Sequence, residues 1–140
     1  MSEDNNVFLS IEFDGLPPTV NQMYRSIGTR RYKTTACQNF QTRLADHIKL
    51  FWGNKPPLTQ HVSLYITFDQ SDRRRWDIDN RVKSLQDCLQ MAGVIKDDSQ
   101  IDLLHLERRH DAERTITRFS LRALDELKRN TENETDINAR

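Results

Sequence analysis

The sequence predicts an α+β fold in which two helices pack on one face of a small mixed β-sheet. Two observations carry this prediction. The segments at 7–13 and 62–68 alternate apolar and polar residues, as half-buried strands do. The segments at about 34–52 and 79–92 repeat apolar residues every three to four positions, as amphipathic helices do. A chain of 140 residues suits one domain, 1–124, and the polar tail at 125–140 is expected to be disordered.

The first half of the chain contains a strand, a loop and a helix. After the strand at 7–13, a loop with two prolines and two glycines is expected over 14–33. Thr34 or Thr35 can cap the first helix, and Gly53 with the prolines that follow it ends that helix.

The second half adds a strand, a helix and two more strands. After the strand at 62–68, Asp79 fits the N-cap of the second helix and Gly93 fits the position just beyond its end. The segments at about 101–109 and 114–122 predict a hairpin around the sequence HDAE, although their alternation is imperfect.

Composition predicts a soluble cytoplasmic protein with a modest core. Hydrophobic residues make up 36% and charged residues 30%, and no apolar run approaches the length of a membrane span. The start MSEDNN lacks the pattern of a secretory signal. Cys37 and Cys88 fall on apolar faces of the predicted helices, so both are expected to be buried free thiols in a reducing compartment. No Cys/His spacing suggests zinc.

The distribution of charge says more than the net charge of zero. Of 21 acidic and 21 basic residues, the ends at 1–6 and 123–140 hold 7 acidic and 3 basic, which leaves 14 and 18 in 7–122, a balance of +4. Two basic clusters carry much of it, at Arg25, Arg30, Arg31 and Lys33, and at Arg73, Arg74 and Arg75. Such clusters can follow DNA phosphates, whereas the alternative is that they are solvated loops.

Two acidic clusters stand at the two ends of the second predicted helix. Asp77 and Asp79 are two residues apart, so in an extended segment both carboxylates point to the same side. Once Gly93 has turned the chain, Asp97 or Asp98 can approach this pair. Carboxylates that converge without His or Cys form an oxygen-only site, which favours Mg²⁺, with Mn²⁺ as a substitute, over zinc or copper.

Lys83 lies one predicted helical turn after Asp79, on the side of the acids, where it could hold a phosphate or stabilise developing charge. Simpler explanations exist. Asp79 could be only an N-cap worth about 1 kcal/mol. Asp79, Lys83 and Asp87 could form a surface ion-pair ladder worth about 0.3–0.5 kcal/mol per pair. The sequence KDDSQ could be a polar turn. An N-cap explains Asp79 but not Asp77. Neither the cap nor the ladder explains the second acidic cluster after Gly93.

The same residues resemble the signature of the RusA family of Holliday junction resolvases. The resemblance covers roughly 7–122 and is carried by DIDN at 77–80, Lys83, Asp87, AGV at 92–94 and DDSQ at 97–100. The arginine run DRRRW at 72–76 and LPPTVNQMYR at 16–25 add to it.

The resemblance implies a homodimeric, Mg²⁺-dependent endonuclease that resolves four-way DNA by paired symmetric nicks in recombination and repair. The metal-binding acids would be Asp77, Asp79 and Asp98, with Asp97 ranked second, and Lys83 would be the essential lysine. Such a protein would act near the nucleoid of a bacterial or phage-infected cell. Leu16, Met23, Tyr24 and Trp52 are candidates for the dimer interface.

Trp76 departs from the family pattern, which commonly has a basic residue before the first Asp; here Arg75 lies one place earlier. Trp76 could stack on an exposed DNA base at the crossover, or it could be an aromatic residue of the core or of the dimer interface. Two rival functions also remain open. One is a branched-DNA-binding module without cleavage, and the other is a structural dimer in which the acids only cap helices and form ion pairs.

Overall fold

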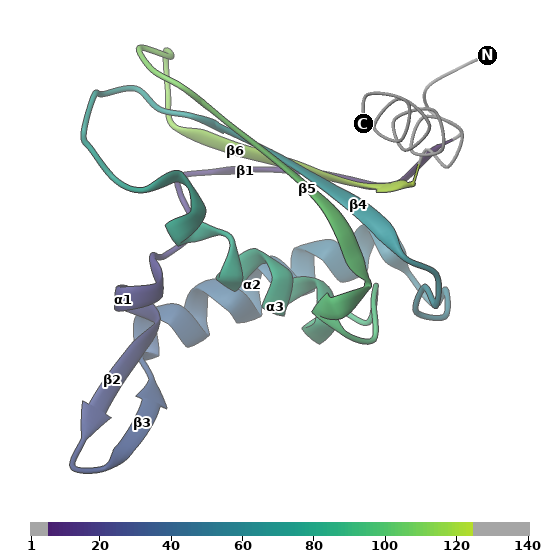
Figure 1. The fold of residues 1–140 in the computed structure, drawn as a ribbon, viewed down its shortest axis with the longest axis horizontal. Helices are drawn as coiled ribbons and strands as arrows, with labels where there is room; N and C mark the ends of the chain where they lie inside the picture. Colours follow the sequence, from purple (N-terminus) through teal and green to yellow (C-terminus); the bar gives the residue numbers. More distant parts are fainter. Residues whose placement is uncertain (1–5, 125–140) are drawn as a thin grey trace, which may run out of the picture.

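The computed structural model describes residues 6–124. Its centre is a four-stranded mixed sheet in the order β1 (Val7–Asp14), β6 (Ile116–Ala123), β4 (Val62–Asp69) and β5 (Ile101–Arg109). β6 runs antiparallel to both of its neighbours, and β5 runs parallel to β4. Helices α2 (Thr35–Trp52) and α3 (Lys83–Met91) lie on one face of the sheet (Figure 1). The predicted fold class is therefore confirmed for the chain itself.

The core lies between the sheet and the two helices. Alternate strand residues turn inward because side chains along a strand point to opposite faces. The inward residues of β1, β4 and β6 pack with the apolar faces of α2 and α3, and the cluster includes Leu9, Ile11, Leu64, Ile66, Phe68, Phe119, Leu121, Leu44, Ile48, Leu85 and Leu89. Cys37 and Cys88 are buried free thiols, as predicted. Within residues 6–124, no helix is both long and apolar enough to cross a bilayer.

The helix ends follow the predicted caps in three of four places. Thr34 Oγ1 accepts a hydrogen bond from the backbone N–H of Cys37 at 3.2 Å, and α2 ends at Gly53 with a positive φ of 67°. Gly93, with φ of 76°, follows α3. Its N–H donates to the carbonyl of Gln90 at 3.0 Å, and the N–H of Val94 donates to that of Leu89 at 3.0 Å. This pair of bonds is the Schellman motif, which favours glycine at the left-handed position.

The segment predicted as a loop at 14–33 contains a short helix and a hairpin. After α1 (Val20–Met23), strands β2 (Tyr24–Ile27) and β3 (Arg30–Lys33) pair antiparallel and project away from the sheet (Figure 1). Gly28, with φ of 64°, occupies the first position of the two-residue turn, where a positive φ suits the twist of a hairpin. Both strands are mostly exposed, so they lack the apolar alternation by which the other strands were predicted.

The predicted hairpin of 101–109 with 114–122 was wrong, because β4 lies between β5 and β6. Burial explains the order. β6 is buried on both faces over much of its length, and an interior strand suits it. β5 exposes the run Asp102–His105 and occupies the edge. The connection at 110–115 packs instead on the loop after β4, where the N–H of Ala112 donates to the carbonyl of Gln70 at 3.0 Å.

Burial also corrects two of the four candidates for a dimer interface. Met23 is fully buried and Trp52 is only 4% exposed in the isolated chain. Both therefore belong to the chain's own interior, because side chains with so little exposed surface offer almost none to a partner.

Candidate active site

The α-helix that was predicted to begin at Asp79, in the acidic segment between β4 and α3, begins later in the chain. Ile78–Arg81 forms a 3₁₀ turn, here η2, and α3 starts at Lys83. Neither Asp77 nor Val82 makes a side-chain cap bond. Trp76 and Ile78 pack against the core, which keeps the chain extended through Asp77 and delays the helix. Asp77 and Asp79 are left exposed, in agreement with the predicted period of two.

Trp76 is held in place by three kinds of contact. Its Nε1 donates to Oε1 of the buried Gln70 at 2.9 Å, and its ring meets Phe68 edge-on with centroids 5.1 Å apart. The guanidinium carbons of Arg81 and Arg108 lie 4.8 and 5.0 Å from the ring centroid. In this chain Trp76 is therefore a half-buried core aromatic with cations against its ring, as one of the two predicted alternatives had it.

Lys83 and Asp98 are brought together although they lie 15 positions apart in the sequence. Lys83 Nζ lies 3.0 Å from Asp98 Oδ2 and 3.1 Å from Asp87 Oδ1. The pKa of Lys83 is raised, first by its hydrogen bond to Asp98 and then, against some desolvation, by Asp87. The lysine is thus a cation at neutral pH. Its partner Asp98 is the first residue of η3 (Asp98–Gln100).

Asp87 has a second set of partners. Its Oδ2 lies 3.8 Å from Lys33 Nζ at the base of the hairpin, and it accepts a hydrogen bond from Gln41 Nε2 at 3.4 Å. One carboxylate therefore contacts both the hairpin and the candidate lysine. The predicted ladder is only partly present, because Lys83 pairs with Asp87 but not with Asp79.

Asp97 has a structural role that Asp98 lacks. Its side chain accepts from the N–H of Ser99 at 3.0 Å and closes a capping box with Gln100. These bonds, led by Ser99, lower the pKa of Asp97. Gln100 in turn donates to the carbonyls of Leu58 and Gln60, at 2.8 and 3.0 Å, and so fixes the turn to the body.

The structure does not gather Asp77, Asp79 and Asp98 into one cluster. Among residues 6–124, no group of three Asp, Glu, His or Cys side chains is arranged to hold a metal ion. The donor chemistry nevertheless fits Mg²⁺. Asp77 and Asp79 are exposed carboxylates without an ion pair in the described part of the chain, and hard oxygen ligands are those that Mg²⁺ prefers.

A basic hollow surrounds Asp77. We call it the Asp77 hollow; its volume is about 500 Å³, and it is lined by Arg73, Arg75, Trp76, Asp77, Arg108 and His110. Its three arginines and one carboxylate together carry two net positive charges. Arg108 was not predicted. It stands on β5 opposite Phe68, and only the pairing of β5 with β4 brings it to Asp77.

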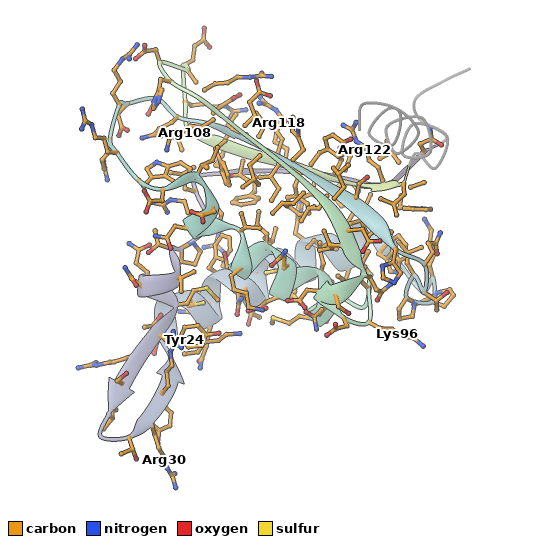
Figure 2. All side chains as sticks on the ribbon, in the orientation of Figure 1. Tyr24, Arg30, Lys96, Arg108, Arg118 and Arg122 are labelled. Atoms are coloured by element: carbon orange, nitrogen blue, oxygen red, sulfur yellow. The ribbon has the colours of Figure 1, made fainter. Side chains whose placement is uncertain are left out.

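The two predicted basic clusters differ in their surroundings. Arg25, Arg30, Arg31 and Lys33 all lie on the β2–β3 hairpin, and Arg30 stands at its outer end, well away from the sheet (Figure 2). Arg31 stacks 4.2 Å from the ring centroid of Tyr24. In the loop at 70–77, Arg73 pairs with Asp111, and Arg74 lies 3.3 Å from Asp72. Arg75 is exposed, with no ion pair within residues 6–124.

The comparisons with known proteins agree on one kind of enzyme. Residues 14–118 match the family described as Endodeoxyribonuclease RusA. The chain is 34% identical over 89 residues to the Crossover junction endodeoxyribonuclease RusA of Aquifex aeolicus (strain VF5), covering 63% of this chain and 69% of the relative. It is 30% identical over 95 residues to the Crossover junction endodeoxyribonuclease rusA of Enterobacteria phage HK97, covering 66% and 76%.

These matches define the class of protein as that of the crossover junction endodeoxyribonucleases, enzymes that hydrolyse phosphodiester bonds within DNA. Within this class the chain belongs to the RusA family. The matched residues include the hairpin, the loop at 70–77, η2, α3 and η3, and therefore every candidate site residue predicted from the sequence.

Proposed function

We propose that the protein is a Mg²⁺-dependent Holliday junction resolvase that acts as a homodimer in the cytoplasm of a bacterial or phage-infected cell, close to the nucleoid. The observation that carries this proposal is the Asp77 hollow, which combines three arginines with an exposed carboxylate that has no ion pair within residues 6–124. A DNA phosphate is attracted by the arginines, and the carboxylate is a ligand for a cation. The Lys83–Asp98 pair lies at the start of the following helix.

In this proposal Asp77, Asp79 and Asp98 hold the metal ion, with Asp97 as the second choice in its place. A bound Mg²⁺ would neutralise charge at the scissile phosphate and acidify the attacking water. Lys83 is kept protonated by Asp98 and Asp87, so it can stabilise the negative charge that develops on the phosphate. Asp98 must then share its carboxylate between Lys83 and the metal.

The basic residues would bind the arms of the junction through their phosphates. Those on the hairpin are Arg25, Arg30, Arg31 and Lys33, and those after β4 are Arg73, Arg74 and Arg75. Contacts of this kind position DNA without reading its bases. A homodimer would present two such sites, related by a two-fold axis, to the two opposed strands of a junction, which allows paired symmetric nicks.

A second candidate function is a branched-DNA-binding module that does not cut. One observation favours it, namely that the described acids are not gathered into a metal-binding cluster. The alternative of a purely structural dimer is weaker, because Asp77 makes no cap bond and no ion pair in the described part of the chain.

The deciding experiment is cleavage of a labelled four-way junction and of the matching linear duplex, with and without Mg²⁺. Wild type, Asp77→Asn and Asp46→Asn are compared, because Asp46 is an exposed acid on α2 outside both acidic clusters. We expect paired nicks in the junction alone, dependent on Mg²⁺ and Asp77 but not on Asp46. Junction binding without a cut in Mg²⁺ or Mn²⁺ would establish the binding module instead.

A further inference from the structure

Arg81 is a partly buried cation that forms no ion pair within the described part of the chain. Its Nη1 donates to the carbonyl of Pro17 at 2.6 Å, and its guanidinium lies against the ring of Trp76. Its Nε is enclosed by protein and has no hydrogen-bond partner among the residues that the structure describes. Among residues 6–124 no acid forms an ion pair with it. A buried donor without a partner is unusual in a folded protein, so such a group needs an explanation.

Arg81 lines a second hollow, which we call the Arg81 hollow, with a volume of about 620 Å³. Arg74 and Asp72 are its other charged residues, so its lining carries one net positive charge. Asp72 is already engaged by Arg74 and by Gln70, and these contacts, led by Gln70, lower its pKa. Asp72 therefore forms its ion pair with Arg74 and not with Arg81.

The electrostatic surroundings of Arg81 favour an added anion. Burial is the larger cause, and the nearby Arg74 the smaller, of the lowered pKa of Arg81. Both causes disfavour its positive charge, and the opposite charge of an anion near the two arginines would offset them. A phosphate suits such a pair, because guanidinium groups bind phosphate oxygens through charged hydrogen bonds.

Most of the uncharged residues that line the hollow are apolar, and the others are Gln22, Gln70 and Thr115. The apolar wall consists of Leu16, Pro18, Ala36, Phe40 and Trp76. An inorganic phosphate would make no use of this wall, whereas the sugar and base of a nucleotide would cover it. The volume lies within the range of about 300–1,000 Å³ that is usual for small-ligand sites.

We propose that the Arg81 hollow binds one nucleotide of the DNA substrate, with its phosphate at Arg81 and Arg74 and its sugar and base against the wall of Phe40 and Leu16. The inference rests on the proposed DNA-cleaving function and adds a site to it. Trp76 lines both hollows, so the bound nucleotide lies close along the strand to the phosphate at Asp77. Arg81 thereby sets where the strand lies relative to the acids.

The test is a chemical double-mutant cycle on binding, measured without metal so that cleavage plays no part. A four-way junction carries one uncharged methylphosphonate linkage at a time, moved through the positions around the branch. For wild type, we expect one linkage near the cut position to weaken binding about 10- to 100-fold, the effect of losing a charged hydrogen bond of about 1.5–3 kcal/mol. Arg81→Gln should bind unmodified DNA more weakly by a similar factor and show no further loss at that linkage.

The matched control is Arg122→Gln. Arg122 also lies over an aromatic ring, 4.1 Å from the centroid of Tyr65, but it stands at the far end of β6 and lines neither hollow (Figure 2). It should retain the wild-type response to the modified linkage. If Arg81→Gln fails to fold, Arg81→Lys keeps the charge and should still respond at that linkage, with a smaller loss.

Each outcome decides one part of the proposal. If Arg81→Gln responds to every linkage as wild type does, the phosphate site is refuted. An abasic substitution at the same nucleotide should weaken binding further, and if it has no effect, the base contact is refuted while the phosphate contact stands. If the wild type binds junctions and never cuts them, the nuclease proposal is refuted. The binding measurements still test the Arg81 hollow in that case, because they do not depend on cleavage.

Discussion

Lys83 Nζ lies 3.0 Å from Asp98 Oδ2, so the first residue of α3 and the first residue of η3 form one ion pair. The turn at Gly93 makes this possible, because it returns the chain after α3 and allows η3 to come back to the start of that helix. The pair keeps a cation and a carboxylate at one place beside the acidic segment. The contribution of this pair to the stability of the protein, and that of the turn at Gly93, can each be tested.

The Lys83–Asp98 pair predicts a loss of stability at high pH. The pKa of Lys83 is raised in the folded chain, mainly by Asp98. Its contribution is therefore complete below the unfolded pKa of about 10.4 and is lost as the pH rises through the folded-state pKa. Because Lys83 is 44% exposed, we expect less than about 1 kcal/mol.

The measurement is urea unfolding of wild type and Lys83→Met between pH 7 and 11 without metal. The difference between their free energies of unfolding should be constant to about pH 10 and should shrink above it. Lys49→Met is the control, since Lys49 has no ion pair within residues 6–124. A difference for Lys83→Met that stays flat to pH 11 would contradict the expected role of the pair.

Gly93→Ala should destabilise the protein by about 1–2 kcal/mol, the usual cost of the left-handed conformation for a residue with a Cβ. Gly93 has φ of 76°, and an added Cβ would meet no atom within 4 Å, so the cost is one of backbone conformation rather than of space. Gly93→Asn should cost clearly less, since asparagine tolerates this conformation. Equal losses for both substitutions in thermal unfolding would point to a different cause.

Cys88 should be inert in the folded protein. Burial raises its pKa to about 12, so at pH 8 roughly one thiol in ten thousand is the reactive thiolate. In a Cys37→Ser variant, a thiol reagent at pH 8 should label Cys88 only after denaturant is added. Labelling in the native state at the rate of a free thiol would show that α3 opens locally.

The hairpin should contribute to DNA affinity without contributing to stability. Arg25 and Arg30 are exposed and have no ion pair within the described residues, so replacing both with Ala should leave the melting temperature unchanged. If each contacts one phosphate, the slope of log binding constant against log salt should fall by about 1.8. The control replaces Arg43 and Lys49, two exposed basic residues of α2, and should leave the slope as in wild type.

The periodicity of the chain was sufficient to predict the main helices and the strands of the sheet. A half-buried strand needs alternate apolar residues, as Leu9 and Ile11 show, and a helix on a sheet needs an apolar stripe such as that of Leu44 and Ile48. Caps such as Thr34 and Gly93 are local, so they too can be identified without a structure. The family could be recognised because its signature is a set of residue types at set spacings.

The pairing of the strands, and everything that depends on it, was decided only by the tertiary structure. Neighbouring strands in the sequence need not be neighbours in a sheet. Here β4 separates β5 from β6, because β4 is largely buried and takes an interior position whereas the more exposed β5 takes the edge. Arg108 lines the same hollow as Asp77 through the pairing of β5 with β4, and Arg81 contacts Trp76 and Pro17 through the 3₁₀ turn that replaced the predicted helix start. The sequence by itself determined which residues could do chemistry, since this depends on side-chain type and local spacing. Which cations surround which acids depends on contacts between distant segments, and only the folded chain makes them.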